Sequence, residues 1–106
     1  MADGNRGRVA AAGSTHVVLT GRLTCRDDRE VAVVEQHLRG HVALTIAEVG
    51  CVSFAVTPTA EDGVWEVAEE FVDAAAFEAH QQRVATSEWG RATAGIRRDY
   101  TIRGVV

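Results

Sequence analysis

Apolar residues recur along this chain with two different periods, which together predict alternating strands and helices. Residues 16–25 are rich in β-branched side chains and stop at the turn-forming letters RDD, as a first strand does. Asp27 is followed three residues later by Glu30, a capping-box pattern, so we expect a helix to begin there. The apolar residues of this helix stand three or four apart: Val31, Val34, Leu38 and Val42. The spacing predicts one buried helix face, and Gly50 is expected to end the helix.

The next segment has the alternation of a strand. In residues 51–57 the apolar side chains Val52, Phe54 and Val56 fall on one side. The letters PTAEDG that follow are typical of a turn. We therefore expect a hairpin that leads into a further strand at residues 64–71.

The last third of the chain returns to helical spacing and then to a strand. Asp73 can cap a second helix, on which Phe77, His80 and Val84 share a face. Ser87 can cap a short further helix, and residues 98–105 are expected to form the last strand. The resulting order β-α-β-β-α-β predicts an α+β, ferredoxin-like fold with an antiparallel sheet and helices on one face.

The strands also indicate what covers the second face of the sheet. Consecutive apolar residues in the first and third strands point to both sides: Val17, Val18 and Leu19, and Val64, Trp65, Val67 and Ala68. A solvated face would instead alternate apolar with polar positions. We therefore expect a homodimer in which the sheet faces pack against each other.

Composition limits the classes of protein to consider. With 106 residues, of which 46% are hydrophobic, the chain is expected to form one domain at 15–106, preceded by a flexible leader at 1–14. The leader lacks the apolar core of a signal peptide, and no segment is long and apolar enough to span a bilayer, so a cytoplasmic location without membrane contact is expected. The net charge of −4 disfavours a nucleic-acid partner.

No metal site is expected. Cys25 and Cys51 stand far apart and belong to no C-x-x-C pair, so both are predicted to be free thiols. His37 and His41 have the spacing of two zinc ligands on a helix, but Leu38 stands in place of the glutamate of H-E-x-x-H and no third ligand is evident.

Two motifs resemble those of a known family. Family members usually have E-P-G-C, then two residues and an aromatic, and this chain has Glu48, Val49, Gly50, Cys51 and Phe54 at these positions. A second motif combines acidic, aromatic, capping and histidine positions, matched here by Glu69, Phe71, Asp73, Ala76, Phe77 and His80. From about His16 to Tyr100 the chain thus resembles the antibiotic biosynthesis monooxygenase family.

This resemblance implies a dimeric α+β barrel with an apolar pocket between the sheet and the helices of each subunit. Family members include cofactor-free oxygenases of polycyclic phenols and anthrones, quinol oxidases and haem-degrading enzymes. The haem-degrading members carry an asparagine on the first strand and a histidine after the second helix. In this chain, residues 16–25 contain no asparagine and residues 87–95 contain no histidine. The asparagine and tryptophan of the anthrone oxygenases are not reproduced either. We therefore expect no haem and no other cofactor.

Cofactor-free oxygenation requires a base, because only an electron-rich anion of the substrate can pass an electron to O2. His80 is the candidate base. The alternative is that His80 is a core histidine whose polar atoms are satisfied by a protein partner. Glu69 would pair with an arginine (Arg22, Arg98 or Arg103) or relay a proton. Six residues are expected to bind an aromatic substrate or, as the alternative, to be core or dimer contacts: Trp65, Phe71, Phe54, Glu69, His41 and Phe77.

Two functions of different classes follow. The first is a cofactor-independent monooxygenase that oxidises a small phenolic or hydroquinone substrate, or a polycyclic aromatic one, with O2. The alternative is a non-catalytic, dimeric ligand-binding or interaction module of the same fold. The two are separated by whether a bound aromatic ligand is turned over.

Overall fold

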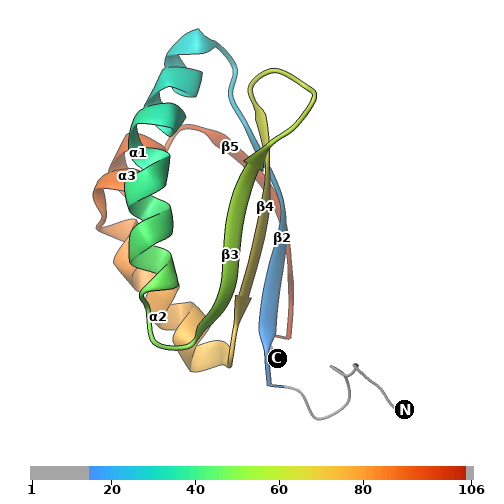
Figure 1. Cartoon of the computed structure of the whole chain (residues 1–106), viewed down its shortest axis with the longest axis vertical. Coiled ribbons are helices and arrows are strands. Elements are labelled where there is room, and N and C mark those ends of the chain that lie inside the picture. Colours follow the sequence, from blue (N-terminus) through green and yellow to red (C-terminus); the bar gives the residue numbers. More distant parts are fainter. Residues whose placement is uncertain (1–14, 105–106) are drawn as a thin grey trace.

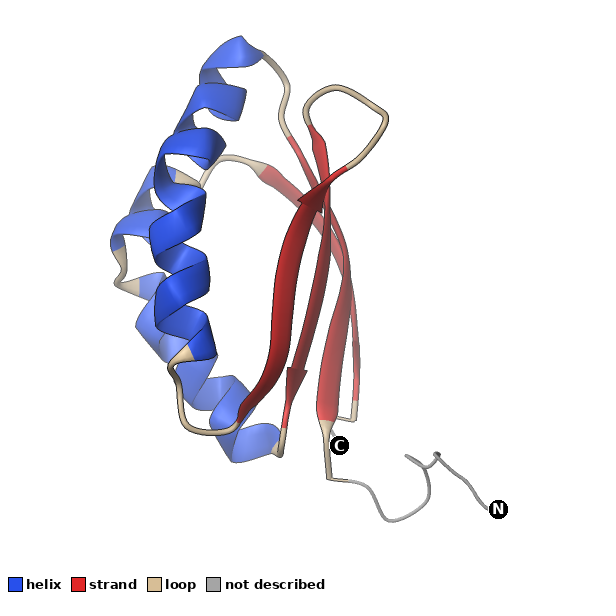
Figure 2. Ribbon diagram, viewed as in Figure 1, coloured by secondary structure: helices blue, strands red, loops and turns tan. Residues whose placement is uncertain are grey.

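The computed structural model describes residues 15–104 and shows a four-stranded antiparallel sheet with three helices on one face (Figures 1 and 2). The predicted leader at 1–14 lies outside the described residues. The strand order is β3-β4-β2-β5, so the predicted ferredoxin-like β-α-β-β-α-β arrangement is confirmed. The elements are β2 (Val17–Thr24), α1 (Asp28–Ile46), β3 (Cys51–Pro58), β4 (Val64–Phe71), α2 (Ala74–Ala85), α3 (Glu88–Ala92) and β5 (Arg97–Arg103).

Each helix begins at the cap that its sequence predicts. The Asp27 carboxylate accepts a hydrogen bond from the Glu30 amide at 3.0 Å, and Glu30 Oε1 accepts one from the Arg26 amide at 2.9 Å. Asp73 and Ser87 accept from the amides of Ala76 and Gly90 at the starts of α2 and α3. These bonds satisfy amides that no helical carbonyl can reach.

The end of α1 differs from the prediction. The helix stops at Ile46, and Gly50 belongs to the turn that enters β3 with a φ of +92°. A Cβ at Gly50 would lie 2.6 Å from the Cβ of Ala76 in α2. Glycine is needed there because the backbone is left-handed and also passes close to α2.

The buried face of α1 carries polar side chains. Its most buried residues are Val34, His41 and Thr45, whereas Leu38 and Val42 are only half-buried. The hydroxyl of Thr45 is satisfied because it donates to the His41 carbonyl at 2.8 Å. Hydrophobic spacing located the inner face, but it could not show that a histidine and a threonine lie deepest on it.

A β-bulge changes the pattern predicted for β3. Cys51 pairs with Phe71 and Ser53 with Glu70, so Val52 is an extra residue in the strand. Val52 is 49% exposed, whereas Phe54 is 8% exposed. The prediction that both lie on one side is therefore wrong, because the bulge shifts the alternation before Phe54.

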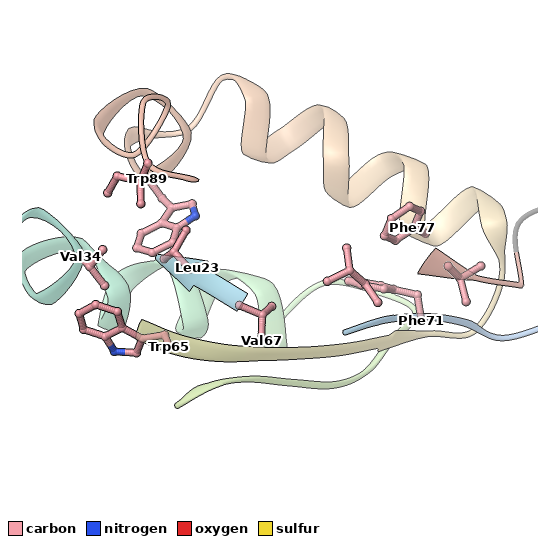
Figure 3. Packing of buried hydrophobic residues seen from close by; sticks show 10 residues of the cluster. Leu23, Val34, Trp65, Val67, Phe71, Phe77 and Trp89 are labelled. Carbon is pink, nitrogen blue, oxygen red and sulfur yellow. The ribbon is translucent and has the colours of Figure 1, made fainter. Parts of the chain in front are cut away.

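The core lies between the sheet and the helices and has two ends (Figure 3). Figure 3 shows Trp65 beside Val34 at one end, and Phe71 near Phe77 at the other. Trp65, Val67, Glu69 and Phe71 alternate along β4, and all four are buried on its helix-facing side. Glu69 is the one charged group among them.

Within the described part of the chain, all helices lie on one face of the sheet and none covers the other (Figure 2). Thr20, Arg22, Glu66 and Ala68 are exposed there, and Val18 is half-buried. This face therefore mixes small, charged and apolar residues, and its burial against a second copy of the chain stays a prediction. Among residues 15–104, no helix is long and apolar enough to cross a membrane.

Candidate functional site

A cavity of about 60 Å³ lies between the sheet and the helices. Four of the residues predicted to form the site line it: His41 from α1, Phe54 from β3, Glu69 from β4 and His80 from α2. The other lining residues are Leu19, Val56, Val67, Gln81, Val84, Trp89, Arg98 and Tyr100. Side chains from both helical and sheet layers therefore converge on one small space.

His80 is held by a carboxylate from outside its own helix. It is 2% exposed, and its Nδ1 lies 2.8 Å from Oε1 of Glu48, in the connection from α1 to β3. The other oxygen of Glu48 accepts from Nε of Arg83, which lies one turn beyond His80 on α2. Nη2 of Arg83 donates to the Thr45 hydroxyl at 3.0 Å. This chain of contacts fixes the orientation of the imidazole between two helices.

The partners of His80 determine which nitrogen can act as a base. A carboxylate accepts hydrogen bonds, so its contact with Glu48 assigns the proton to Nδ1 and leaves the lone pair on Nε2. Burial lowers the pKa of His80, and the hydrogen bond to Glu48 opposes this effect in part. A neutral imidazole with a free Nε2 can accept a proton from a bound ligand.

Glu69 faces that nitrogen from the sheet. Its Oε1 lies 3.7 Å from Nε2 of His80, is buried, and has no hydrogen-bond partner among the described residues. Burial raises the pKa of Glu69 to about 7, and the charge of Glu48 adds to the rise. The carboxyl can therefore hold a proton close to neutral pH.

The predicted ion pair between Glu69 and an arginine is not formed. Arg22 lies 3.9 Å from Glu66 on the open face of the sheet. Arg98 donates to the carbonyls of Thr93 and Ile96. Within residues 15–104, Glu69 instead approaches Nε2 of His80, at 3.7 Å. The prediction was wrong because charge alone does not say which face of a strand each partner occupies.

His41 lies in a layer of rings. Its imidazole stacks on Trp89 with centroids 4.6 Å apart and planes 4° apart, and it meets Phe54 edge-on at 5.2 Å. Burial lowers the pKa of His41 to about 4, with smaller contributions from His80 and Arg83. The buried Nδ1 of His41 has no hydrogen-bond partner among the described residues. His41 is thus a neutral ring with one unused polar atom.

Three residues predicted to bind substrate do not line the cavity: Trp65, Phe71 and Phe77. Trp65 is six residues from Phe71, roughly 20 Å along an extended strand, and it packs in the core (Figure 3). The ring of Phe71 lies 4.8 Å from that of His80 and 5.8 Å from that of Phe77. Phe71 therefore supports His80 from the core, with Phe77 behind it.

The structure brings together several residues to which the sequence pattern assigns no role. Glu48 stands out in the sequence only as part of a motif, and Arg83 and Trp89 belong to no motif. The sequence signals for the last two are weak: Arg83 is one helical turn after His80, and Trp89 is the aromatic residue of a five-residue helix. Their proximity depends on how the helices pack.

Tyr100 reaches the cavity across Gly21 of the neighbouring strand. A Cβ at Gly21 would lie 2.8 Å from Cδ1 of Tyr100, so this glycine leaves the space that the ring occupies. Burial raises the pKa of Tyr100, which remains a hydroxyl donor.

No group of three or more possible metal ligands is found among residues 15–104.

Comparison with known proteins agrees with this architecture. The family model for antibiotic biosynthesis monooxygenases matches residues 16–92. No curated protein is similar enough to this sequence to count as a relative.

Two solved structures show the same fold at low identity. A Nitrosomonas europaea protein, named provisionally as an antibiotic biosynthesis monooxygenase, is 17% identical with a TM-score of 0.75, over 91% of this chain and 95% of its own. SnoaB, a cofactor-independent oxygenase from Streptomyces nogalater, is 14% identical with a TM-score of 0.71, over 87% of this chain and 94% of its own.

A third structure is more similar in sequence. PA3566 from Pseudomonas aeruginosa is 26% identical with a TM-score of 0.65, over 87% of this chain and 93% of its own. The family match spans well over half of the 106 residues and includes His41, Glu48, Phe54, Glu69 and His80. This chain therefore belongs to the antibiotic biosynthesis monooxygenase family.

Proposed function

We propose that the protein is a cofactor-independent monooxygenase that oxidises a small phenolic or hydroquinone substrate with O2, with His80 as the base. One observation carries the proposal: the buried imidazole is held through Nδ1 by Glu48, while its other nitrogen lies at the wall of a cavity. A histidine that was merely satisfied in the core would use both nitrogens on protein partners. Among residues 15–104, the contact of Nε2 is the distant oxygen of Glu69, at 3.7 Å.

The chemistry needs no external reductant. Nε2 of His80 takes the phenolic proton, and the resulting anion supplies electrons to O2. With a hydroquinone, one oxygen atom enters the ring and the other leaves as water, so hydroquinone and O2 give a hydroxyquinone and water. A substrate that fills the cavity would displace water from around His80, and that water would otherwise compete for the anion.

When it is protonated, the carboxyl group of Glu69 can stabilise the substrate anion. With its pKa raised to about 7, the carboxyl retains a proton to near-neutral pH and can donate a hydrogen bond to the phenolate oxygen. An ionised Glu69 would instead repel the anion. The proposal therefore assigns Glu69 as the hydrogen-bond donor opposite His80.

The size of the cavity favours a small substrate over a polycyclic one. A volume of about 60 Å³ holds a few water molecules, since each needs roughly 10–15 Å³. A benzene-sized ligand occupies a cavity of roughly 150 Å³. Side chains must move even for a single ring, and several fused rings would require a much larger rearrangement.

Oxygen uptake tests the proposal. Methylhydroquinone and unsubstituted hydroquinone would be supplied to the wild type, to His80→Ala and to the control His16→Ala, with autoxidation without protein subtracted. His16 contacts Glu70 and does not line the cavity. We expect His80→Ala to lower kcat roughly 100-fold or more, the usual contribution of a general base, and His16→Ala to leave it unchanged. Equal rates in wild type and His80→Ala would remove His80 from the mechanism.

The alternative function gives a different result. A non-catalytic ligand-binding module would bind a phenol in a thermal-shift assay without consuming O2. Tight binding with no product from any hydroquinone would therefore replace the proposed activity with that alternative.

We also infer that the open face of the sheet pairs with a second copy of the chain. Small side chains form a row across all four strands: Ala55, Ala68, Thr20 and Thr101 are neighbours in register. Such a row lets another sheet approach closely, near the usual spacing of about 10 Å. Glu66 and Arg22, which flank it, offer charges of both signs to a symmetry-related face.

Light scattering at micromolar concentration tests the dimer. We expect twice the mass of the chain for the wild type and for Ala79→Arg, which lies on the exposed side of α2. Ala68→Arg should give the single-chain mass, because a long charged side chain would stand in the centre of the row. A monomeric wild type would contradict the inference.

A further inference from the structure

A second hollow, of about 140 Å³, lies between α1 and α3. We call it the α1/α3 groove; its lining includes Gly40, Leu44, Arg83, Ser87 and Glu88. His41 and Trp89 line both this groove and the inner cavity. Their stacked rings therefore form a wall that the two hollows share.

Two polar atoms of residues that line the groove lack partners. Nη1 of Arg83 and Nδ1 of His41 are buried and make no hydrogen bond among the described residues. The other two nitrogens of Arg83 are used by Glu48 and Thr45. Because a buried donor without an acceptor is destabilising, Arg83 offers one directed N–H to a ligand oxygen.

The charges around Arg83 favour a neutral ligand oxygen over a charged one. Glu48 already neutralises the guanidinium, and Glu88 lines the same groove. Burial keeps His41 neutral, so it adds no positive charge. A carboxylate ligand would meet more negative than positive charge, whereas a carbonyl or hydroxyl oxygen can accept the hydrogen bond without that repulsion.

The volumes indicate how a ring would fit. The inner cavity, at about 60 Å³, is well below the roughly 150 Å³ that holds benzene, whereas the two hollows together exceed that volume. Trp89 is carried by the five-residue α3, and His41 by the nineteen-residue α1. Trp89 is thus the side of the wall that can shift with less disruption.

We propose that the α1/α3 groove is the second half of the substrate site. A one-ring phenol displaces the wall between His41 and Trp89 and places a neutral acceptor oxygen, a carbonyl or a hydroxyl, on Arg83 Nη1, with its phenolic hydroxyl at His80. His41 and Trp89 then contact the two faces or edges of the ring, and Arg83 determines which substituents are accepted. This inference rests on the proposed function for the inner half of the site.

Anaerobic binding measured by calorimetry tests the choice of oxygen without requiring turnover. The probes are phenol, para-hydroxyacetophenone, which adds a neutral carbonyl, and para-hydroxybenzoate, which adds a carboxylate. We expect para-hydroxyacetophenone to bind about tenfold more tightly than phenol, the value of one hydrogen bond to a charged donor, and more tightly than para-hydroxybenzoate. Equal binding of phenol and para-hydroxyacetophenone, tightest binding of the carboxylate, or no binding of any probe would overturn the inference.

A matched pair of glycine variants tests the location. Neither Gly40 nor Gly95 has any atom within 4 Å of a Cβ built on it, but only Gly40 lines the groove. Gly40→Leu should fill the groove and raise the Kd of para-hydroxyacetophenone about tenfold, whereas Gly95→Leu should leave it unchanged. An unchanged Kd in a folded Gly40→Leu protein would also overturn the inference.

The two proposals fail in distinguishable ways. If the α1/α3 groove is not part of the substrate site, Gly40→Leu will bind para-hydroxyacetophenone as tightly as the wild type does, while O2 uptake by the wild type still depends on His80. Failure of the proposed oxygenase would appear as absent O2 uptake, while para-hydroxyacetophenone still bound in the groove.

Discussion

Nδ1 of His80 and Oε1 of Glu48 lie 2.8 Å apart, although 32 residues separate them in the chain. Glu48 follows α1 and His80 lies within α2, so the bond connects the two long helices above the sheet. It determines both the orientation of the imidazole and the nitrogen that remains available.

Replacing Glu48 by glutamine should lower the pKa of His80 further. Glu48 raises that pKa through its hydrogen bond and its charge, and an amide retains only a weakened form of the bond. NMR titration of the His80 ring proton measures the shift, and the looser ring should lower kcat roughly 10- to 100-fold. Glu70→Gln is the control, because Glu70 contacts His16 instead. A His80 pKa that is unchanged in Glu48→Gln would show that the bond has little electrostatic effect.

Replacing Glu69 by glutamine should stabilise the protein increasingly as the pH rises from 4.5 to about 7. The pKa of Glu69 is raised from 4.5 to about 7 in the fold, so the folded state holds a proton that the unfolded state has lost across this range. Stability is therefore lost as the pH rises, by roughly 3 kcal/mol in total. Glutamine does not titrate and avoids that loss. Urea unfolding at several pH values measures the difference from wild type, and a difference independent of pH would contradict the raised pKa.

Replacing His41 by phenylalanine should have the opposite pH dependence. The pKa of His41 is lowered from 6.5 to about 4, so the unfolded chain binds a proton that the folded protein excludes. The wild type therefore loses roughly 3 kcal/mol of stability as the pH falls from 6.5 to about 4. Phenylalanine preserves a ring against Trp89 and removes this loss. The free energy of unfolding of His41→Phe, minus that of the wild type, should increase toward low pH. If this difference instead increased toward high pH, as expected for Glu69→Gln, the lowered pKa of His41 would be refuted.

Two glycine-to-alanine variants should change stability in opposite directions. Gly50→Ala places a Cβ 2.6 Å from Ala76 on a backbone with φ of +92°, so we expect a loss of at least about 1–2 kcal/mol. Gly40→Ala adds a Cβ in open space within α1 and should stabilise by up to about 1 kcal/mol. Thermal and urea unfolding compare them. A Gly50→Ala protein as stable as wild type would mean that the turn into β3 can rearrange.

Local signals accounted for the elements of the fold. Asp27, Asp73 and Ser87 each marked a helix start, because capping depends on residues within one turn of each other. The end of α1 and the bulge at Val52 were not predicted correctly, since each depends on packing against residues distant in sequence. Gly50 is needed where it is because of Ala76, which belongs to another helix.

The order of strands and helices, the family resemblance and four of the residues that line the cavity (His41, Phe54, Glu69 and His80) can be inferred from the sequence alone. Period and capping are local, so they can be read from one chain. The folded structure was needed to show that Trp65 does not line the cavity, that Glu69 faces a histidine and not an arginine, and that Glu48 and Arg83 hold the imidazole. Those relationships join residues from different layers, and their distances depend on how the helices pack on the sheet, which no local pattern encodes.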